Sequence, residues 1–177
     1  MKPVYLLTGL PGSGKTSLIK QAFAKAKGNA GGFYTEEIRS QGGRQGFRLV
    51  TLDGDTATLA HTDIHSQYRV SRYRVDIDSL ERVGVSALRR AAQHSDMVVV
   101  DEIGKMELFS PRFRETVLEI IDSVKRVLGT IMLAPNPWAD AIKGKPQVKI
   151  IEVTRANREP VLAELLDWLN ATGEDKE

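Results

Sequence analysis

The sequence predicts an α/β fold in which a mostly parallel β-sheet is covered by helices on both faces. The first observation is that short apolar runs alternate with segments whose apolar residues recur at helical spacing. The second is that, over residues 32–61, extended segments follow one another with only turn residues between them. We therefore expect a parallel core with an antiparallel hairpin extension.

The N-terminal elements are a strand, a loop and a helix. Residues 4–7 form a short apolar run closed by glycine, which is typical of a buried strand. A glycine-rich loop spans residues 9–14. Residues 16–27 then carry apolar side chains at helical spacing, and Gly28 is a natural end for that helix.

The hairpin extension comes next in the chain. It is predicted from three strand-like segments and two turns, at residues 32–39, 41–43, 47–52, 53–55 and 56–60 in chain order. Residues 62–77 are polar and are predicted to be irregular. They hold Arg69, Arg72 and Arg74 beside two tyrosines, a group that we interpret as a solvated loop rather than an RNA contact.

Alternation of strands and helices returns after residue 77. The predicted elements are a helix near 78–94, a strand at 97–100, a helix from Ser110-Pro111 to about residue 127, strands at 129–134 and 148–153, and a helix over 158–170 for which Asn157 is a candidate cap. Residues 135–137 break the strand before them, and residues 173–177 are predicted to form a frayed tail. Such a sheet binds ligands beyond the carboxyl ends of its strands.

Composition narrows the classes of function. The chain has 177 residues, which favours a single domain over 1–177. It has no cysteine, which excludes thiol catalysis and cysteine-bound metal clusters and fits a cytoplasmic location. The net charge of +2 gives no indication of nucleic-acid binding, and no apolar run is long enough to span a membrane.

The strongest motif is the segment from Gly9 to Thr16, Gly-Leu-Pro-Gly-Ser-Gly-Lys-Thr. It fits G-x-x-x-x-G-K-[ST] and lies between a predicted strand and a predicted helix, which is the context that this motif requires. Its glycines let successive backbone N–H groups converge on phosphate oxygens, at the N-terminus of the following helix. Lys15 is expected to reach the β- and γ-phosphates, and Thr16 to ligate Mg²⁺.

The second motif is the acidic pair Asp101-Glu102, which closes the apolar run at 97–100. Asp101 is expected to hold the Mg²⁺ shell, and Glu102 to act on the attacking water. We therefore predict three catalytic residues, Lys15, Asp101 and Glu102, and two metal ligands, Thr16 and Asp101. The acidic pair favours hydrolysis over phosphate transfer, because a hydrolase needs a base beside the γ-phosphate.

Other candidates surround these motifs. Lys105 and Glu107 follow the acidic pair as neighbours of the γ-phosphate or as a solvated loop, and Arg39 and Arg44 flank the hairpin turn as candidates for phosphate contact. After the last strand, Asn157 and Arg158 offer a hydrogen bond or a stacking face to a base. The nucleotide-binding set is Gly9, Leu10, Pro11, Gly12, Ser13, Gly14, Lys15, Thr16, Ser17, Gly104, Lys105, Asn157 and Arg158. The three histidines have no metal spacing.

Several of these segments together resemble a known family. They are 7–17, 32–39, 43–47, Tyr73-Arg74-Val75-Asp76, Asp101-Glu102-Ile103-Gly104-Lys105-Met106-Glu107 and Asn157-Arg158. The chain resembles, over about residues 4–170, the small P-loop nucleoside-triphosphatases first described from thermophiles, whose human member is called cancer-related nucleoside-triphosphatase.

The resemblance implies a RecA-like sheet, a Mg²⁺ cofactor and slow hydrolysis of ATP, GTP, CTP and UTP with little base specificity. It assigns residues 9–16 to the phosphates and Asp101-Glu102 to metal and water. It gives no secure role to Glu36, Arg39, Arg44, Lys105 or Glu107. Relatives often carry a polar or basic γ-phosphate sensor after the strand at 129–134, where Asn136 is the candidate substitute in this chain.

Two alternatives stay open at this point. A nucleoside, nucleotide or polynucleotide kinase would use the same phosphate loop with a hydroxyl acceptor and an arginine-rich lid. A regulatory nucleotide switch would hydrolyse slowly until a partner is bound. The sequence leaves the preferred base, the physiological substrate, the oligomeric state, the protein partner and the source of any arginine finger undetermined.

Overall fold

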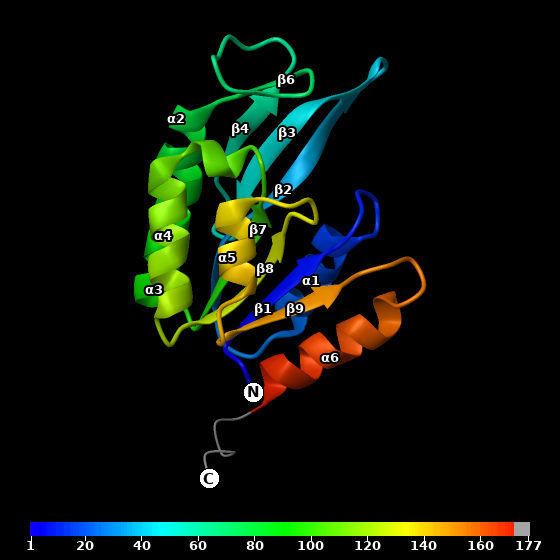
Figure 1. Ribbon diagram of the computed structural model, residues 1–177, viewed down its shortest axis with the longest axis vertical. Helices are drawn as coiled ribbons and strands as arrows, with labels where there is room; N and C mark the ends of the chain where they lie inside the picture. Colours follow the sequence, from blue (N-terminus) through cyan, green and yellow to red (C-terminus); the bar gives the residue numbers. More distant parts are fainter. Residues whose placement is uncertain (172–177) are drawn as a thin grey trace.

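A computed structural model describes residues 1–171, and within them a nine-stranded sheet lies between two layers of helices (Figure 1). The strand order is β5-β6-β4-β3-β2-β7-β8-β1-β9. The predicted α/β class is confirmed. The frayed tail predicted at 173–177 lies outside the described residues.

Five strands form the parallel half of the sheet. They are β1 (Val4–Thr8), β2 (Ala30–Ser40), β7 (Met97–Ile103), β8 (Arg126–Ile131) and β9 (Val148–Glu152). β1 pairs with β8 on one side and with β9 on the other, and β7 lies between β8 and β2. The carboxyl ends of β1 and β7, where the two sequence motifs begin, therefore lie at the same edge with one strand between them.

The antiparallel half grows out of β2. Its other strands are β3 (Gly43–Thr51), β4 (Thr56–His61), β5 (Arg69–Val70) and β6 (Tyr73–Val75). β2 pairs with β7 through residues 30–33 and with β3 through residues 33–40, so the extension continues the same sheet. The expectation of a mostly parallel sheet is corrected, because four neighbouring pairs are parallel and four antiparallel. β5 and β6 also lie in a segment that we predicted to be irregular.

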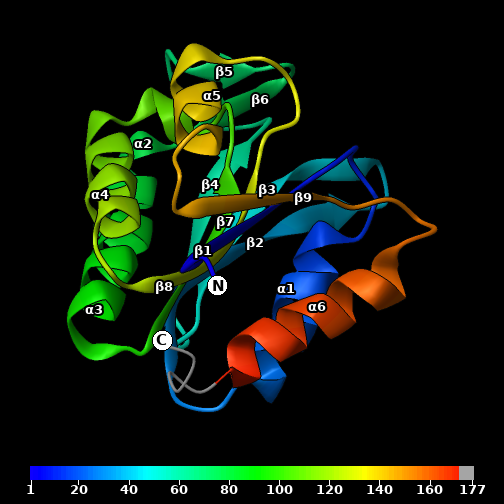
Figure 2. The same ribbon diagram turned by 60° about the horizontal axis from the view of Figure 1, so that its bottom comes forward.

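The helices divide between the two faces of the sheet (Figure 2). One face carries α1 (Lys15–Lys25) and α6 (Arg158–Asn170). The other carries α2 (Ile77–Ser79), α3 (Ser86–His94), α4 (Pro111–Asp122) and α5 (Pro137–Lys143), with a π-helical segment at Leu80–Val85 joining α2 to α3. A short 3₁₀ turn, Glu107–Phe109, follows β7.

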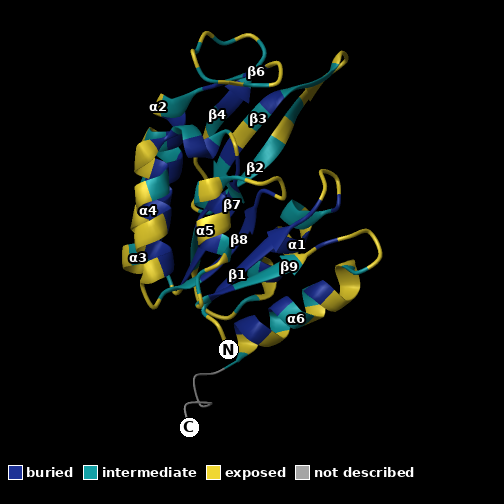
Figure 3. Ribbon diagram, viewed as in Figure 1, coloured by how far each residue is buried: buried dark blue, intermediate teal, exposed yellow. Residues whose placement is uncertain are grey.

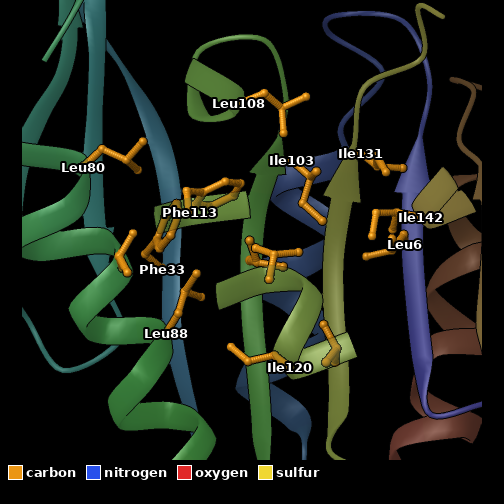
Figure 4. Close-up of a cluster of buried hydrophobic side chains, with 14 of the residues drawn as sticks. Leu6, Phe33, Leu80, Leu88, Ile103, Leu108, Phe113, Ile120, Ile131 and Ile142 are labelled. Atoms are coloured by element: carbon orange, nitrogen blue, oxygen red, sulfur yellow. The ribbon is translucent and has the colours of Figure 1, made fainter. Parts of the chain in front are cut away.

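The central strands are buried (dark blue in Figure 3), and their side chains alternate between two hydrophobic clusters. In β1, Val4 and Leu6 belong to the cluster under α2–α5, part of which is drawn in Figure 4, whereas Tyr5 and Leu7 face α1 and α6. Tyr5 stacks on Trp168 of α6 with ring centroids 4.2 Å apart. Both faces of β1 are therefore buried, as the short apolar run predicted.

Three predicted boundaries near the C-terminal half were wrong. α4 ends at Asp122 rather than near residue 127, because Ser123 is extended and its N–H closes the last turn onto Glu119 and Ile120. Val127 pairs with Val4 in the sheet, so β8 spans 126–131 rather than 129–134. α5, which begins at Pro137 after a short connection, was not predicted. No helix within residues 1–171 is long and apolar enough to cross a membrane.

Candidate active site

The loop between β1 and α1 is shaped by three glycines. Gly9, Gly12 and Gly14 have φ values of 148°, 78° and 94°, a region that other residues rarely adopt. A Cβ atom on Gly9 would also lie 2.5 Å from the carbonyl oxygen of Val153. The close approach and the backbone conformation both require glycine, so the loop curls with its N–H groups available at the start of α1.

Lys15 folds back over this loop. Its Nζ donates hydrogen bonds to the carbonyl oxygens of Gly9 and Leu10, at 2.8 and 3.1 Å. Leu10 and Pro11 form the exposed tip, and Ser17 is exposed and accepts a hydrogen bond from Gln21. The hydroxyl of Ser13 is buried without a hydrogen-bond partner among residues 1–171. The loop thus holds a cation and a free hydroxyl where an anion would bind.

Asp101 joins the second motif to the loop. Its Oδ2 accepts a 2.8 Å hydrogen bond from Thr16 Oγ1 and a longer one, 3.4 Å, from the Thr35 amide, while Oδ1 accepts a 2.6 Å bond from Thr130 Oγ1. The side chain is only 2% exposed. Burial raises its pKa, and the Thr130 and Thr16 hydrogen bonds act against that rise.

Glu102 is half-buried beside Asp101 and packs over Gly104. A Cβ atom on Gly104 would lie 2.3 Å from Glu102 Oε1, so the glycine leaves the space that the carboxyl group occupies. Burial, with the charge of Asp101 second, raises the pKa of Glu102, and the charge of Lys15 lowers it. Glu102 is thus a carboxyl whose basicity is increased, beside the phosphate loop.

Glu107 is buried, so the alternative that it lies in a solvated loop is wrong. It is 4% exposed, although it has no ion pair within residues 1–171. Burial raises its pKa well above 4.5, with the charge of Glu102 as the next cause. Lys105, its neighbour in the motif, is exposed. The two residues therefore have different environments.

The donor set at Thr16 and Asp101 fits Mg²⁺. A hydroxyl and a carboxylate are hard oxygen ligands, and Mg²⁺ is usually held by one or two carboxylates together with substrate phosphates and water. No group of three or more His, Asp or Glu side chains within residues 1–171 is arranged to hold a metal. The chain therefore offers part of a coordination shell, and a triphosphate would complete it.

The comparisons with known proteins agree with this site. A family model described as NTPase matches residues 4–166. A nucleoside-triphosphatase THEP1 from a Thermotoga species is 47% identical over 172 residues, covering 97% of this chain and 98% of that protein. The chain belongs to the THEP1 nucleoside-triphosphatase family. The human cancer-related nucleoside-triphosphatase is 37% identical and covers 94% of this chain and 96% of its own length.

Solved structures of THEP1 proteins share the fold. The crystal structure of THEP1 from Aquifex aeolicus superposes with a TM-score of 0.87 at 34% identity, covering 95% of this chain and 99% of that one. The solution structure of the human cancer-related nucleoside triphosphatase gives 0.80 at 35% identity, over 98% and 100% of the two chains. The family resemblance is therefore confirmed, and it implies the P-loop NTPase fold for this sheet.

The described partners of the hairpin arginines lie within the antiparallel extension. Arg39 and Arg44 both pair with Glu37, at 2.7 and 3.2 Å, and Arg44 Nε also donates to Tyr73 Oη at 2.8 Å. No hydrogen bond or ion pair described for residues 1–171 joins either arginine to residues 9–17. Their contact with phosphate remains a prediction.

Asn157 and Arg158 follow β9, and Arg158 lies beside the phosphate loop. Asn157 makes no side-chain cap for α6, which corrects that expectation; its amide instead binds Thr154 and Glu152. The guanidinium group of Arg158 lies against Gly14. Asn136 caps α5 by accepting from the amides of Trp138 and Ala139, both at 3.0 Å.

Sequence reasoning missed the residues that orient Asp101. Thr35 and Thr130 look like ordinary strand formers, since threonine is common in strands. The available signal was Thr130 itself, a single hydroxyl in the otherwise apolar run 127–131. Its partner lies 29 residues away, so the pairing needs the register of β7 against β8.

Proposed function

We propose that this protein hydrolyses nucleoside triphosphates to the diphosphate and phosphate, with Mg²⁺ as cofactor and little base specificity. The single observation that carries the proposal is the 2.8 Å contact between Thr16 of the phosphate loop and Asp101 of β7, with Glu102 adjacent. It joins a phosphate-binding loop, a metal-ligating pair and a basic carboxylate in one place. Membership of the THEP1 family supports the same activity.

The phosphate loop binds the substrate. The N–H groups of residues 9–16 and the N-terminus of α1 favour the β- and γ-phosphate oxygens. Lys15 exchanges its two carbonyl partners for phosphate oxygens, where its charge is attracted far more strongly. Because negative charge grows on the β–γ bridging oxygen as the bond breaks, Lys15 stabilises the transition state more than the ground state.

Thr16 and Asp101 would hold the cofactor. Bound Mg²⁺ would supply positive charge that neutralises the triphosphate. Thr130 and Thr35 orient the Asp101 carboxylate for this task.

Glu102 acts on the attacking water. Its carboxylate accepts a hydrogen bond from a water placed in line with the γ-phosphorus, and it accepts the proton as the new P–O bond forms. The bond to the β–γ bridging oxygen breaks, and the diphosphate leaves with that electron pair. The raised pKa of Glu102 suits a general base, because a stronger base accepts the proton more readily.

The test is phosphate release from ATP, GTP, CTP and UTP, with and without Mg²⁺. Wild-type protein should release phosphate from all four only with Mg²⁺. Lys15→Ala should abolish nucleotide binding or turnover. Glu102→Gln should keep binding but slow release by at least about 100-fold. Lys25→Ala, an exposed change at the far end of α1, should match wild type.

Two outcomes would contradict the proposal. Unchanged turnover in Glu102→Gln would remove Glu102 as the base. Tight binding without release, in wild type and variant alike, would favour a kinase lacking its acceptor or a switch lacking its partner.

The RecA-like subclass is part of the same proposal, supported by β8 lying between β1 and β7. A single domain over 1–177 and a cytoplasmic location remain predictions from the sequence.

A further inference from the structure

The nucleoside of a bound triphosphate should project from the phosphate loop toward β9. The phosphate loop follows β1, and the sheet order places β8 and β7 on one side of β1 and β9 on the other. Asp101 and Glu102, which act at the γ-phosphate, are on the β7 side. The triphosphate therefore runs with its γ end toward β7, and the α-phosphate and nucleoside lie toward the loop after β9.

This loop is fastened to the phosphate loop at its base. The Val153 amide donates a 2.8 Å hydrogen bond to the Thr8 carbonyl oxygen, which extends the β9–β1 pairing to the start of the phosphate loop. The close approach of Gly9 to Val153 continues the contact. Val153 thus fixes the start of the 153–158 segment beside the α-phosphate end of the site.

The Asn157 side chain makes hydrogen bonds with the nearby backbone at both ends of its amide. Its Oδ1 accepts a 2.8 Å hydrogen bond from the Thr154 amide, and its Nδ2 donates a 2.8 Å bond to the Glu152 carbonyl oxygen. Each end of an amide can make two hydrogen bonds, so each end of Asn157 keeps one, but the two bonds already made fix the direction of the amide within the loop. The hydrogen-bonding alternative for base recognition is therefore weakened, and the stacking alternative remains.

Arg158 has the geometry of a stacking platform. A Cβ atom on Gly14 would lie 2.6, 2.7 and 2.7 Å from Nη2, Cζ and Nε of Arg158. Nearly equal distances to three atoms of one planar group mean that the guanidinium presents a face, not an end, to Gly14. The residue is exposed, and no hydrogen bond or ion pair is described for it within residues 1–171. It is thus a planar cation that lies against the phosphate loop and has no carboxylate partner among the described residues.

We propose that Arg158, seated on Gly14, is the platform on which the nucleobase stacks, and that it makes base preference follow ring size rather than base identity. A guanidinium stacks on any aromatic face without reading hydrogen-bond donors or acceptors. All four triphosphates are then accepted, and purines bind more tightly than pyrimidines because they offer more area. This inference deepens the proposed function and rests on it for the direction of the bound nucleotide.

The test compares wild type, Arg158→Ala, Arg158→Lys and a control, Arg155→Ala, an exposed arginine of the same loop. KM and kcat are measured for ATP, GTP, CTP and UTP, and inorganic tripolyphosphate, which has no base, is titrated as a competitive inhibitor. Arg158→Ala should raise KM for ATP and GTP by about tenfold, raise it less for CTP and UTP, and leave kcat and tripolyphosphate inhibition unchanged. Arg155→Ala should match wild type.

Arg158→Lys separates stacking from charge. Lysine keeps the charge but lacks the planar face, so it should behave as Arg158→Ala does. Rescue by lysine, or equal weakening of tripolyphosphate inhibition, would make Arg158 a phosphate contact and overturn the inference, as would an unchanged KM for ATP. If wild type releases no phosphate, the proposed function fails instead, and calorimetric affinities of ATP and tripolyphosphate for the same variants still decide the role of Arg158.

Discussion

The hydroxyl of Thr130 on β8 donates a 2.6 Å hydrogen bond to Oδ1 of Asp101 on β7, and both side chains are buried, at 0% and 2% exposed. Thr16 binds the other carboxylate oxygen. Asp101 is thus held by hydrogen bonds from the neighbouring strand β8 and from the phosphate loop. This arrangement leaves the carboxylate little freedom to rotate, so its direction toward a metal is set before substrate arrives.

The first prediction concerns this orientation. Thr130→Val keeps the side-chain shape but leaves Asp101 Oδ1 without its donor, so Mg²⁺ affinity should fall by about 10- to 100-fold. Stability should fall by about 1.5–3 kcal/mol, as expected for a lost bond to a charged group. The measurements are a Mg²⁺ titration of phosphate release and urea unfolding. Thr130→Ser retains the hydroxyl and should stay near wild type, and an unchanged Mg²⁺ requirement in the valine variant would contradict the role.

The second prediction concerns the space beneath Glu102. In Gly104→Ala the new Cβ would lie 2.3 Å from Glu102 Oε1, and the backbone at Gly104 is not left-handed, so the carboxyl group rather than the chain must move. We expect kcat to fall by at least about 100-fold, with nucleotide affinity and unfolding free energy nearly unchanged. Gly144→Ala is the matched control, because its nearest neighbour would be at 3.6 Å. Full activity in Gly104→Ala would mean that the carboxyl position is not critical.

The sequence predicted those parts of the site that are short continuous segments of the chain. The phosphate loop and the Asp101-Glu102 pair each follow an apolar strand, so local pattern identifies the element and the topology brings the motifs together. Thr130 was missed because only the register of β7 against β8 puts its hydroxyl on Asp101. For Glu107 the sequence left two alternatives open, a neighbour of the γ-phosphate and a solvated loop, since its burial depends on packing around the turn after β7.

The fold shows a similar division between local and long-range information. The hairpin of β2 and β3 was predicted because its turn residues and alternation are local signals. β5 and β6 have two and three residues, too few for a periodic pattern, and α5 has seven. Val124 and Val127 continue the apolar spacing of α4, but Val127 pairs with β1 and β7 and therefore belongs to β8.

The third prediction concerns Asn136, the candidate γ-phosphate sensor. Its Oδ1 already accepts two backbone amides at the start of α5, so its structural work is helix capping. Asn136→Ala should lower the unfolding free energy by about 1 kcal/mol and leave kcat within about twofold. Asn136→Asp, which can still cap, should restore stability. A large loss of kcat in both variants, with stability kept in the aspartate, would instead support a sensor role.

The last prediction concerns Glu107 and pH. Burial raises the pKa of its carboxyl well above 4.5, so the folded protein binds a proton there more tightly than the unfolded chain does. Stability contributed by this group is therefore present below pH 4.5 and is lost as pH rises toward the folded-state pKa, because folding then keeps a proton that the unfolded chain releases. Glu107→Gln has no such proton to lose. The variant should be more stable than wild type at pH 8, and the difference should shrink as pH is lowered toward 4.5. Urea midpoints across this range measure it, with Glu115→Gln, an exposed change on α4, expected to stay within about 0.5 kcal/mol of wild type. A difference between Glu107→Gln and wild type that does not vary with pH would mean that the buried carboxyl is ionised in the folded protein. Glu102 would then have a second negative charge beside it.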